Sequence, residues 1–225
     1  MSERWPMPNR PSGRLLTLEG IEGGGKSTHL PYIRQFLEAA EKSVVVTREP
    51  GGTPLGEALR TVLLQPKYGI LTADAELLLI FAARAEHLAS VITPALREGC
   101  WVVCDRFTDA TYAYQGGGRH IPEARIAVLE EWVQGEIRPD LTLVFDVPVQ
   151  LGLERVARRG EQDRFEREGL EFFERVRRAY LQRAAHDPTR CRVIDSSGSV
   201  EAIRASIAAI LGEWLRSSSS LTGRA

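Results

Sequence analysis

The sequence has few cysteines, no long apolar run and almost no net charge, and each shortage excludes a class of protein. Cys100, Cys104 and Cys191 are an odd number without metal-ligand spacing, which predicts reduced thiols rather than a disulfide framework or a zinc site. No apolar stretch approaches the roughly 20 residues that a transmembrane helix needs. A formal net charge of −1 provides no overall field toward nucleic acid or membranes. We expect binding to neither, so a local cluster of side chains must hold any anionic ligand.

The composition is that of an ordinary globular protein. The chain has 225 residues, 43% of them hydrophobic and 26% charged, which is enough for one sizeable α/β core or at most two small domains. Residues 1–13 are polar and proline-rich and lack the apolar core of an export signal. We therefore predict a flexible lead-in over 1–13, one domain over 14–216, a flexible tail over 217–225, and a cytoplasmic location.

Short apolar runs alternate with longer helical patterns along the whole chain. The runs are RLLTLEG, SVVVTREP, WVVCDRF, LTLVFDVP and RCRVIDSS. The expected helices span 26–40, 55–64, 73–96, 124–136, 150–158, 170–185 and 200–215. Continuous apolar runs rich in β-branched residues are typical of buried parallel strands. The alternation predicts an α/β fold with a doubly wound, five-stranded parallel sheet flanked by helices.

The strongest local signal is GIEGGGKST, which follows the first apolar run and opens the first helix. It fits the phosphate loop of the P-loop proteins, in which backbone N–H groups hold nucleotide phosphates. Lys26 is expected to reach the β- and γ-phosphates, and the Ser27 hydroxyl is expected to bind Mg²⁺. The predicted ATP-binding residues are Gly20, Ile21, Glu22, Gly23, Gly24, Gly25, Lys26, Ser27 and Thr28.

Three further segments carry polar side chains, and the first two place them at the carboxyl ends of predicted strands, where ligands of open α/β sheets bind. Asp105 can hold Mg²⁺, and its neighbour Arg106 can hold a second phosphate. Arg48 opens TREPGGTPLGE, and TYAYQGGGRH offers tyrosines and a glutamine that can stack on a base and bond its edge. The alternatives are an acid that faces water, an ordinary strand-to-helix connection and a flexible glycine link.

Together, GIEGGGKST, TREPGGTPLGE, CDRFTDATYAYQGGGR and RPDLTLVFDV resemble thymidylate kinase of the bacterial type, a P-loop nucleoside-monophosphate kinase family. The resemblance covers residues 14 to about 215. It implies transfer of the γ-phosphoryl group of ATP to dTMP, with Mg²⁺ as cofactor, a mobile lid and a homodimer. The resemblance assigns dTMP binding to these residues: Glu22, Arg48, Phe81, Arg84, Arg106, Thr111, Tyr114 and Gln115.

The resemblance implies that different side chains contact the phosphate, the sugar and the base of dTMP. Arg48 and Arg106 would hold its phosphate, with Asp105 serving the metal. Glu22 would approach the sugar, and Tyr114 would crowd its 2′ position. The remaining polar residues, Arg84, Thr111 and Gln115, would contact thymine.

The sequence departs from the family pattern at the base. The family stacks a phenylalanine on thymine four residues before the helix arginine, where this chain has Ile80, followed by Phe81. We assign the stacking role to Phe81, with two alternatives: Ile80 packs on the base, or Phe81 belongs to the core because apolar helix faces usually do.

The resemblance also implies a catalytic arginine, which some family members carry in the phosphate loop and others supply from the lid; the phosphate loop of this chain contains no arginine. The charged stretch ARRGEQDRFEREG, 157–169, has no apolar face and is expected to be a surface flap within a lid over 155–169. Its vicinity offers the candidates Arg155, Arg158, Arg159 and Arg164. We predict that Arg159 and Arg164 join Lys26 and Arg106 as catalytic residues and that Arg155 lies on the helix leading in. A solvated loop is the alternative.

Two other functions remain open from the residues alone. One is a kinase for another nucleoside monophosphate or for a deoxynucleoside, against which TYAYQGGGR argues. The other is a P-loop switch that hydrolyses nucleotide slowly. A switch needs no second phosphate site, so Arg48 and Arg106 argue against it.

Overall fold

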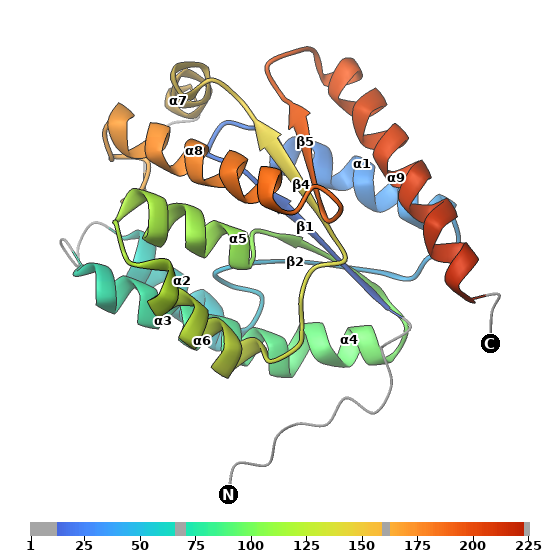
Figure 1. Ribbon diagram of the computed structural model, residues 1–225, viewed down its shortest axis with the longest axis horizontal. Helices are drawn as coiled ribbons and strands as arrows, with labels where there is room; N and C mark the ends of the chain where they lie inside the picture. The colour runs from blue at the N-terminus through green and yellow to red at the C-terminus, as the bar shows by residue number, and fades with distance from the viewer. Residues whose placement is uncertain (1–12, 66–70, 159–162, 223–225) are drawn as a thin grey trace, which may run out of the picture.

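The five predicted strands form one parallel sheet. The structure, a computed structural model, describes residues 13–65, 71–158 and 163–222. The strands are β1 (Arg14–Glu19), β2 (Val44–Arg48), β3 (Trp101–Asp105), β4 (Leu141–Asp146) and β5 (Cys191–Asp195). Their order, β2-β3-β1-β4-β5, places β1 in the centre, with β2 and β3 on one side of it and β4 and β5 on the other (Figure 1). The α/β fold and the five-stranded parallel sheet are confirmed.

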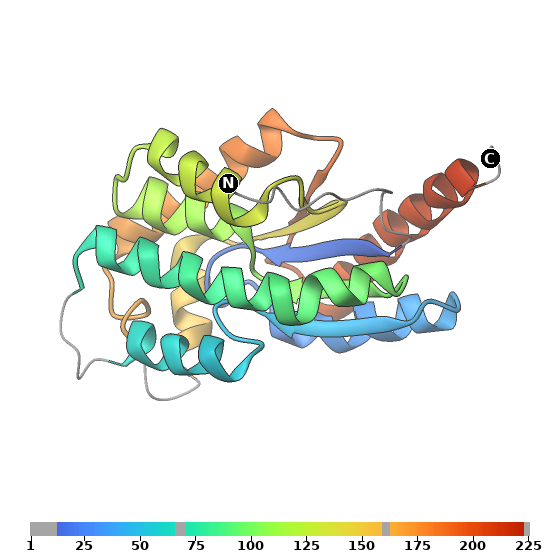
Figure 2. The ribbon, with the colours of Figure 1, turned by 90° about the horizontal axis from the view of Figure 1, so that it is seen from below.

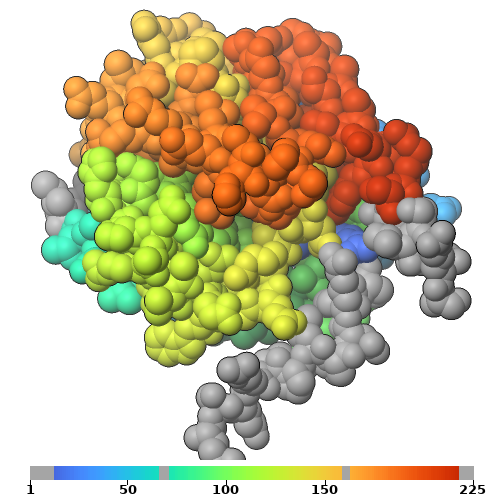
Figure 3. Space-filling model, viewed as in Figure 1, coloured from blue at the N-terminus to red at the C-terminus, as the bar shows by residue number. Residues whose placement is uncertain are grey.

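Helices cover both faces of the sheet, as a doubly wound fold requires. On one face α1 (Lys26–Ala39) and α9 (Val200–Thr222) bury alternate strand residues such as Leu16 and Leu18. On the other face Leu15 packs beneath the helices that precede β3, because successive strand residues point to opposite sides. Figure 3 shows α8 (Leu170–His186) and α6 (Glu123–Gln134) closing this second face over the sheet.

The helix predicted over 73–96 is a continuous rod of three parts. They are α3 (Ala73–His87), the π-helix η2 (Leu88–Ile92) and α4 (Thr93–Arg97), which run end to end in Figure 2. The two short helices α2 (Pro54–Leu64) and α7 (Val149–Ala157) follow β2 and β4. Thr53 and Thr72 begin α2 and α3 by accepting hydrogen bonds from Gly56 and Ala75 backbone N–H groups.

The YAYQGGG segment is helical, which sequence patterning did not predict. After the short helix α5 (Thr108–Thr111), the π-helix η3 (Tyr112–Gly118) carries the tyrosines and the glycines against α8. A Cβ atom on Gly118 would lie 2.5 Å from the ring of Phe172. The glycines therefore permit close packing of two helices, and the flexible link considered above is wrong.

Two segments have structure that their sequence pattern did not predict. The last helix continues to Thr222 and so includes residues 217–222 of the expected tail, whose flexibility stays a prediction. The charged segment 157–169 has an anchored part, because Phe165 is buried beside Tyr114 with ring centroids 5.7 Å apart. Phe165 is isolated within a charged stretch, so its burial depends on the ring of Tyr114, which comes from a distant segment.

No helix in these three described ranges is long and apolar enough to cross a membrane.

Candidate active site

The phosphate loop joins the buried strand β1 to the first turn of α1. Gly23 and Gly25 adopt positive φ angles of 74° and 88°, which L side chains rarely adopt. Gly23 also lies against Gly152 of α7, where a Cβ atom would be 2.1 Å from the Gly152 carbonyl oxygen. The loop thus curls tightly, and the first N–H groups of α1 have no partner within the helix. This is the backbone arrangement that binds phosphate.

Lys26, the first residue of α1, is buried within the loop. Its ammonium group donates to the carbonyl oxygens of Gly20 at 2.9 Å and Ile21 at 3.0 Å. Burial, followed by the nearby charge of Arg106, lowers the pKa of Lys26 to about 8. A phosphate group beside it would favour the charged form, so anion binding and protonation of Lys26 reinforce each other.

A cavity borders the loop, and we call it the loop cavity. Its lining includes loop residues 22–28 together with Arg48, Asp105, Arg106 and Arg155. Asp105 ends β3 next to the final residue of β2, Arg48, in the parallel register. The two neighbouring strand ends therefore bring an acid and an arginine to the same cavity, as the sequence predicted.

Asp105 and Ser27 fit a Mg²⁺ site. The Oδ1 atom of Asp105 is buried and has no hydrogen-bond partner among the described residues. Both residues line the loop cavity and offer the hard oxygen ligands that Mg²⁺ prefers. Within the described ranges no cluster of three or more histidine, cysteine or acidic residues could hold a metal.

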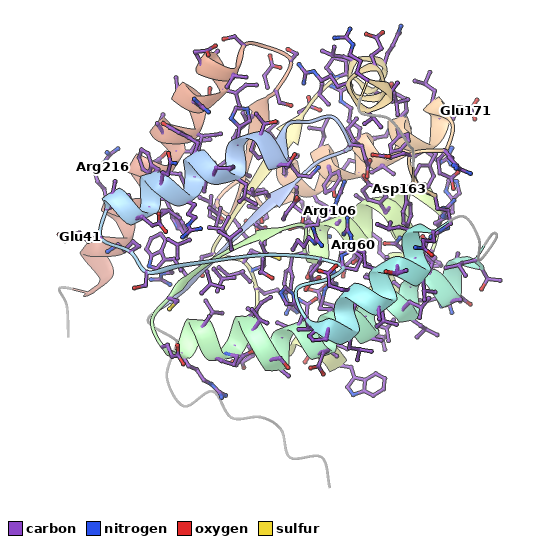
Figure 4. The ribbon with its side chains drawn as sticks, turned by 180° about the vertical axis from the view of Figure 1, so that it is seen from behind. Glu41, Arg60, Arg106, Asp163, Glu171 and Arg216 are labelled. Atoms are coloured by element: carbon purple, nitrogen blue, oxygen red, sulfur yellow. The ribbon has the colours of Figure 1, made fainter. Side chains whose placement is uncertain are left out.

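A second, side-chain-lined cavity adjoins the first, and we call it the inner cavity. Its walls include Ile80, Arg84, Thr111, Tyr114 and Gln115. The residues that line both cavities are Glu22, Glu49, Arg60, Arg106 and Asp163. In Figure 4 the labelled Arg60, Arg106 and Asp163 gather in the middle of the molecule, whereas Glu41, Glu171 and Arg216 lie toward its margin. The two cavities therefore meet at a charged boundary.

Arg106 is the centre of this boundary. Its guanidinium donates to Glu22 at 2.8 Å and to the hydroxyl groups of Tyr114 and Tyr180 at 3.0 and 3.1 Å. The Tyr114 hydroxyl also donates to Glu22. Although burial opposes its charge, these neighbours raise the pKa of Arg106. The sequence-predicted residues Glu22, Arg106 and Tyr114 are thus brought together as one unit.

Arg84 enters the inner cavity from α3 and is fully buried. It donates to Glu49 at 2.7 Å and to the Thr111 hydroxyl at 2.9 Å. The other oxygen of Glu49 bonds His87, one turn further along α3, at 3.0 Å. Sequence reasoning identified Arg84 and Thr111 but missed Glu49. The sequence contained a signal for Glu49. Side chains in extended backbone point to alternate sides, so Glu49, directly after β2, faces away from the exposed Arg48 and into the protein.

The structure corrects the assignment of Phe81. Phe81 is only 3% exposed and packs in a core cluster with Leu77, Tyr112, Ile121 and Ile126, whereas Ile80 lines the inner cavity. Successive helix residues point about 100° apart, so both cannot face the same side. Ile80 precedes Arg84 by four residues and shares its helix face, which is the expected relation for two residues of one site.

Arg60 of α2 is a boundary residue that sequence reasoning missed. It donates to the Pro50 carbonyl oxygen at 3.0 Å. Burial, and then the charges of Arg48 and Arg106, lower the pKa of Arg60. The guanidinium groups of Arg60 and Arg106 therefore lie at the boundary, and that of Arg48 lies beside them in the loop cavity. The sequence did contain a signal for Arg60. This arginine lies one helix turn from Gly56 and from Leu63, and therefore on the buried face of α2.

The predicted lid arginines have different positions. Arg155 lies on α7, as expected, and donates to the carbonyl oxygens of Gly23 at 3.1 Å and Ser196 at 2.9 Å. Arg159 lies outside the described residues. Arg164 does not line the loop cavity: it donates to the Leu63 carbonyl oxygen at 2.7 Å and to Glu76 at 2.6 Å. In this arrangement Arg164 anchors the segment to α2 and α3.

Glu19 lies beneath the boundary and was also missed. It is fully buried at the end of β1, where it accepts hydrogen bonds from the Phe107 backbone N–H at 2.7 Å and the Tyr180 hydroxyl at 2.9 Å. Burial, with repulsion from Asp109, raises the pKa of Glu19 to about 8. Glu19 therefore supports the turn that carries Arg106 into the boundary.

Comparison with known proteins agrees with this geometry. A family model for thymidylate kinase matches residues 18–207. A thymidylate kinase of Pseudomonas savastanoi pv. phaseolicola is 57% identical over 204 residues, which are 91% of this chain and 97% of the relative. One from Pseudomonas putida is 60% identical over 200 residues, 89% of this chain and 95% of the relative. The crystal structure of thymidylate kinase from Ehrlichia chaffeensis has a TM-score of 0.74 and 33% identity, covering 90% of this chain and 99% of that one. By sequence and by fold, this chain belongs to the thymidylate kinase family.

Proposed function

We propose that the protein transfers the γ-phosphoryl group of ATP to the phosphate of dTMP, forming dTDP and ADP. The observation that carries this proposal is the meeting of the two cavities at Glu22, Arg60 and Arg106. A phosphate loop alone accounts for nucleotide binding. An adjoining cavity with two arginines at its entrance, Arg60 and Arg106, accounts for a second, phosphorylated substrate.

The chemistry requires alignment more than a proton acceptor. A monophosphate is largely a dianion at neutral pH because its second pKa is about 6. One of its oxygens attacks the γ-phosphorus, and the bond from that phosphorus to the bridging β–γ oxygen breaks, so that ADP leaves with the electron pair. Lys26 and the loop N–H groups hold the donor, while Arg48, Arg60 and Arg106 orient the acceptor phosphate.

We include Mg²⁺ in the proposal as the cofactor. Bound Mg²⁺ neutralises charge on the β- and γ-phosphates. Ser27 and Asp105 would hold it, supported by the unpartnered Asp105 oxygen beside the loop cavity.

The deoxyribose and the base would occupy the inner cavity. Arg84 supplies donors, Gln115 supplies a carboxamide, and Ile80 supplies a flat apolar surface. Tyr114 would exclude a ribose 2′-hydroxyl, because its ring is held on one side by Phe165 and its hydroxyl is held by Glu22 and Arg106. Arg159 remains our prediction for the lid cation that meets the transferred phosphoryl group.

A steady-state assay tests the proposed reaction. ADP release is measured with ATP and Mg²⁺, alone and with each of dTMP, dUMP, dCMP, dGMP and thymidine. We expect release that depends on the acceptor and is fastest with dTMP. Equal release without any acceptor would indicate a hydrolytic switch. Faster release with another acceptor would instead indicate a different small kinase.

We also propose a homodimer in the cytoplasm. Trp132 and Val128 of α6 are 81% and 67% exposed, and Leu78 of the adjoining helix α3 is 57% exposed. Exposed large apolar groups on two packed helices favour an interface. Light scattering should give twice the chain mass, and Trp132→Glu should give the single-chain mass. Three unpaired cysteines agree with a reducing compartment.

A further inference from the structure

Glu76 is a fully buried acid on α3 that no step of the proposed reaction uses. Its Oε1 accepts from the Gln115 amide nitrogen at 2.7 Å and from Arg119 at 3.3 Å. Its Oε2 accepts from Arg164 at 2.6 Å. A buried carboxylate is costly unless it is paired, so these partners determine where it can lie. Glu76 does not line either cavity.

Glu76 imposes a polarity on the Gln115 carboxamide. An ionised carboxylate only accepts hydrogen bonds, so the Gln115 atom facing it must be the amide nitrogen. The amide oxygen of Gln115 then accepts no hydrogen bond from the described residues. Gln115 itself lines the inner cavity. The carboxamide thus keeps its donor inside the protein and has an acceptor available for a ligand.

Arg84 provides the opposite polarity in the same cavity. Glu76, Ile80 and Arg84 are spaced four residues apart along α3 and therefore follow one helix face. Arg84 has only donors, whereas the oxygen of Gln115 is an acceptor. Thymine offers a matching pair in its O4 acceptor and its N3–H donor. Cytosine reverses both groups, with an N4 amino donor and an N3 acceptor.

We propose that Glu76 is a positioning residue that makes the inner cavity select thymine over cytosine by holding the Gln115 amide nitrogen away from the base. This inference rests on the proposed phosphorylation of dTMP. Through Arg164, the same carboxylate also anchors the segment that carries Phe165 beside Tyr114. Both the selection of the base and the position of residues 163–168 therefore depend on Glu76.

The test is the ratio of kcat/KM for dTMP to kcat/KM for dCMP, measured for wild type, Glu76→Gln and Glu168→Gln. Glu168 is the matched control, because it pairs with Arg119 at 2.6 Å but has no contact with Gln115. We expect Glu76→Gln to lower the ratio about tenfold or more, since a carboxamide at 76 permits Gln115 to turn its amide nitrogen toward the base. Glu168→Gln should keep the ratio within about threefold, as surface ion pairs are weak. A loss of folded enzyme scales both substrates equally and leaves this ratio unchanged.

An exchange variant provides the second test. In Glu76→Gln combined with Gln115→Glu, the amide nitrogen at 76 donates to one oxygen of the new carboxylate, and the other oxygen remains an acceptor for the base. We expect this variant to regain most of the preference for dTMP. An unchanged ratio in Glu76→Gln, or no recovery in the exchange variant, would overturn the assignment.

Glu76→Asp covers the case in which either variant does not fold. This variant keeps the negative charge near Arg164 and Arg119, but its shorter side chain withdraws the carboxylate from Gln115. The dTMP-to-dCMP ratio of kcat/KM should therefore fall in this variant too. An unchanged ratio would also overturn the assignment. The wild-type measurement separates this inference from the proposed function. If the wild type does not prefer dTMP, the proposed function is refuted. If the wild type prefers dTMP and the Glu76 variants keep the same preference, only the role of Glu76 is refuted.

Discussion

The loop cavity and the inner cavity adjoin, yet they are built in different ways. Seven consecutive residues, 22–28, form one continuous wall of the loop cavity, where a phosphate would be bound chiefly through backbone N–H groups. The inner cavity is assembled from side chains of the loop after β2, of α2, α3, α5 and η3, and of the 163–168 segment. Backbone recognition depends on a local turn, whereas side-chain recognition depends on how distant segments pack. A short motif can therefore predict the first site but not the partners within the second.

The buried acids sharpen this difference. Glu49 holds Arg84, and Glu76 holds Gln115 and Arg164. Glu76 lines neither cavity and Glu49 lines both, yet each acid determines what a neighbouring side chain offers to the substrate. The loop cavity needs no comparable support, because glycine conformations already aim its N–H groups. We expect substitutions in the two regions to produce separable defects.

The largest separation should come from Lys26→Ala. Loss of the ammonium group removes charge neutralisation at the transferred phosphoryl group, so kcat should fall by roughly 10³-fold or more. Equilibrium binding of dTMP should remain near that of wild type, because Lys26 does not line the inner cavity. Arg34→Ala, on the exposed side of α1, is the control. Turnover within tenfold of wild type would refute the assignment of the phosphate loop.

Arg60→Ala should produce the complementary defect. Removing one of the two boundary guanidinium groups should raise KM for dTMP by about 10- to 100-fold, because charge-assisted bonds to phosphate are strong. The dissociation constant for ATP should change much less. Arg125→Ala, at an exposed ion pair with Asp74, controls for loss of an arginine. An equal loss of ATP affinity would place Arg60 on the donor side of the boundary instead.

Tyr114 tests whether packing sets sugar selection. Tyr114→Ala should reduce the preference for dTMP over its ribose counterpart by about tenfold, because the space for a 2′-hydroxyl opens. Tyr114→Phe keeps the ring against Phe165 and should retain most of that preference, while losing the hydrogen bonds to Glu22 and Arg106. The measurement is kcat/KM for both nucleotides. The same preference in wild type and Tyr114→Ala would assign sugar selection to another residue.

The smallest effect should be the pH dependence that Glu19, beneath the boundary, gives to the free energy of unfolding. The pKa of Glu19 is raised from 4.5 to about 8 in the folded protein, so the folded state retains a proton that the unfolded state releases. This contribution is fully present below pH 4.5 and is lost as the pH rises through 8. Between pH 7 and 8, wild type should lose about 1 kcal/mol of unfolding free energy that Glu19→Gln does not lose. Urea unfolding at the two pH values measures the difference, and parallel losses would contradict the shift.

The helix bearing Ile80 illustrates the limit of prediction from sequence. Apolar periodicity correctly located a helix over 73–96, and Arg84, which the family pattern indicated, lines the inner cavity. It did not decide between Ile80 and Phe81, because an all-apolar stretch has no polar side to orient it. Packing of Phe81 against Leu77 and Tyr112 made that decision.

By itself the sequence determined the five strands, most helix boundaries and the phosphate loop, because apolar periodicity and glycine conformation act over a few residues. It also placed Arg48 and Asp105 together, since parallel strands end at one edge of a sheet. Only the tertiary structure decided that Arg164 pairs with Glu76, that the glycines of η3 admit α8, and that Arg60 reaches the boundary. These contacts join residues far apart in the chain. The burial that makes an unpaired charge costly therefore exists only after the segments have packed.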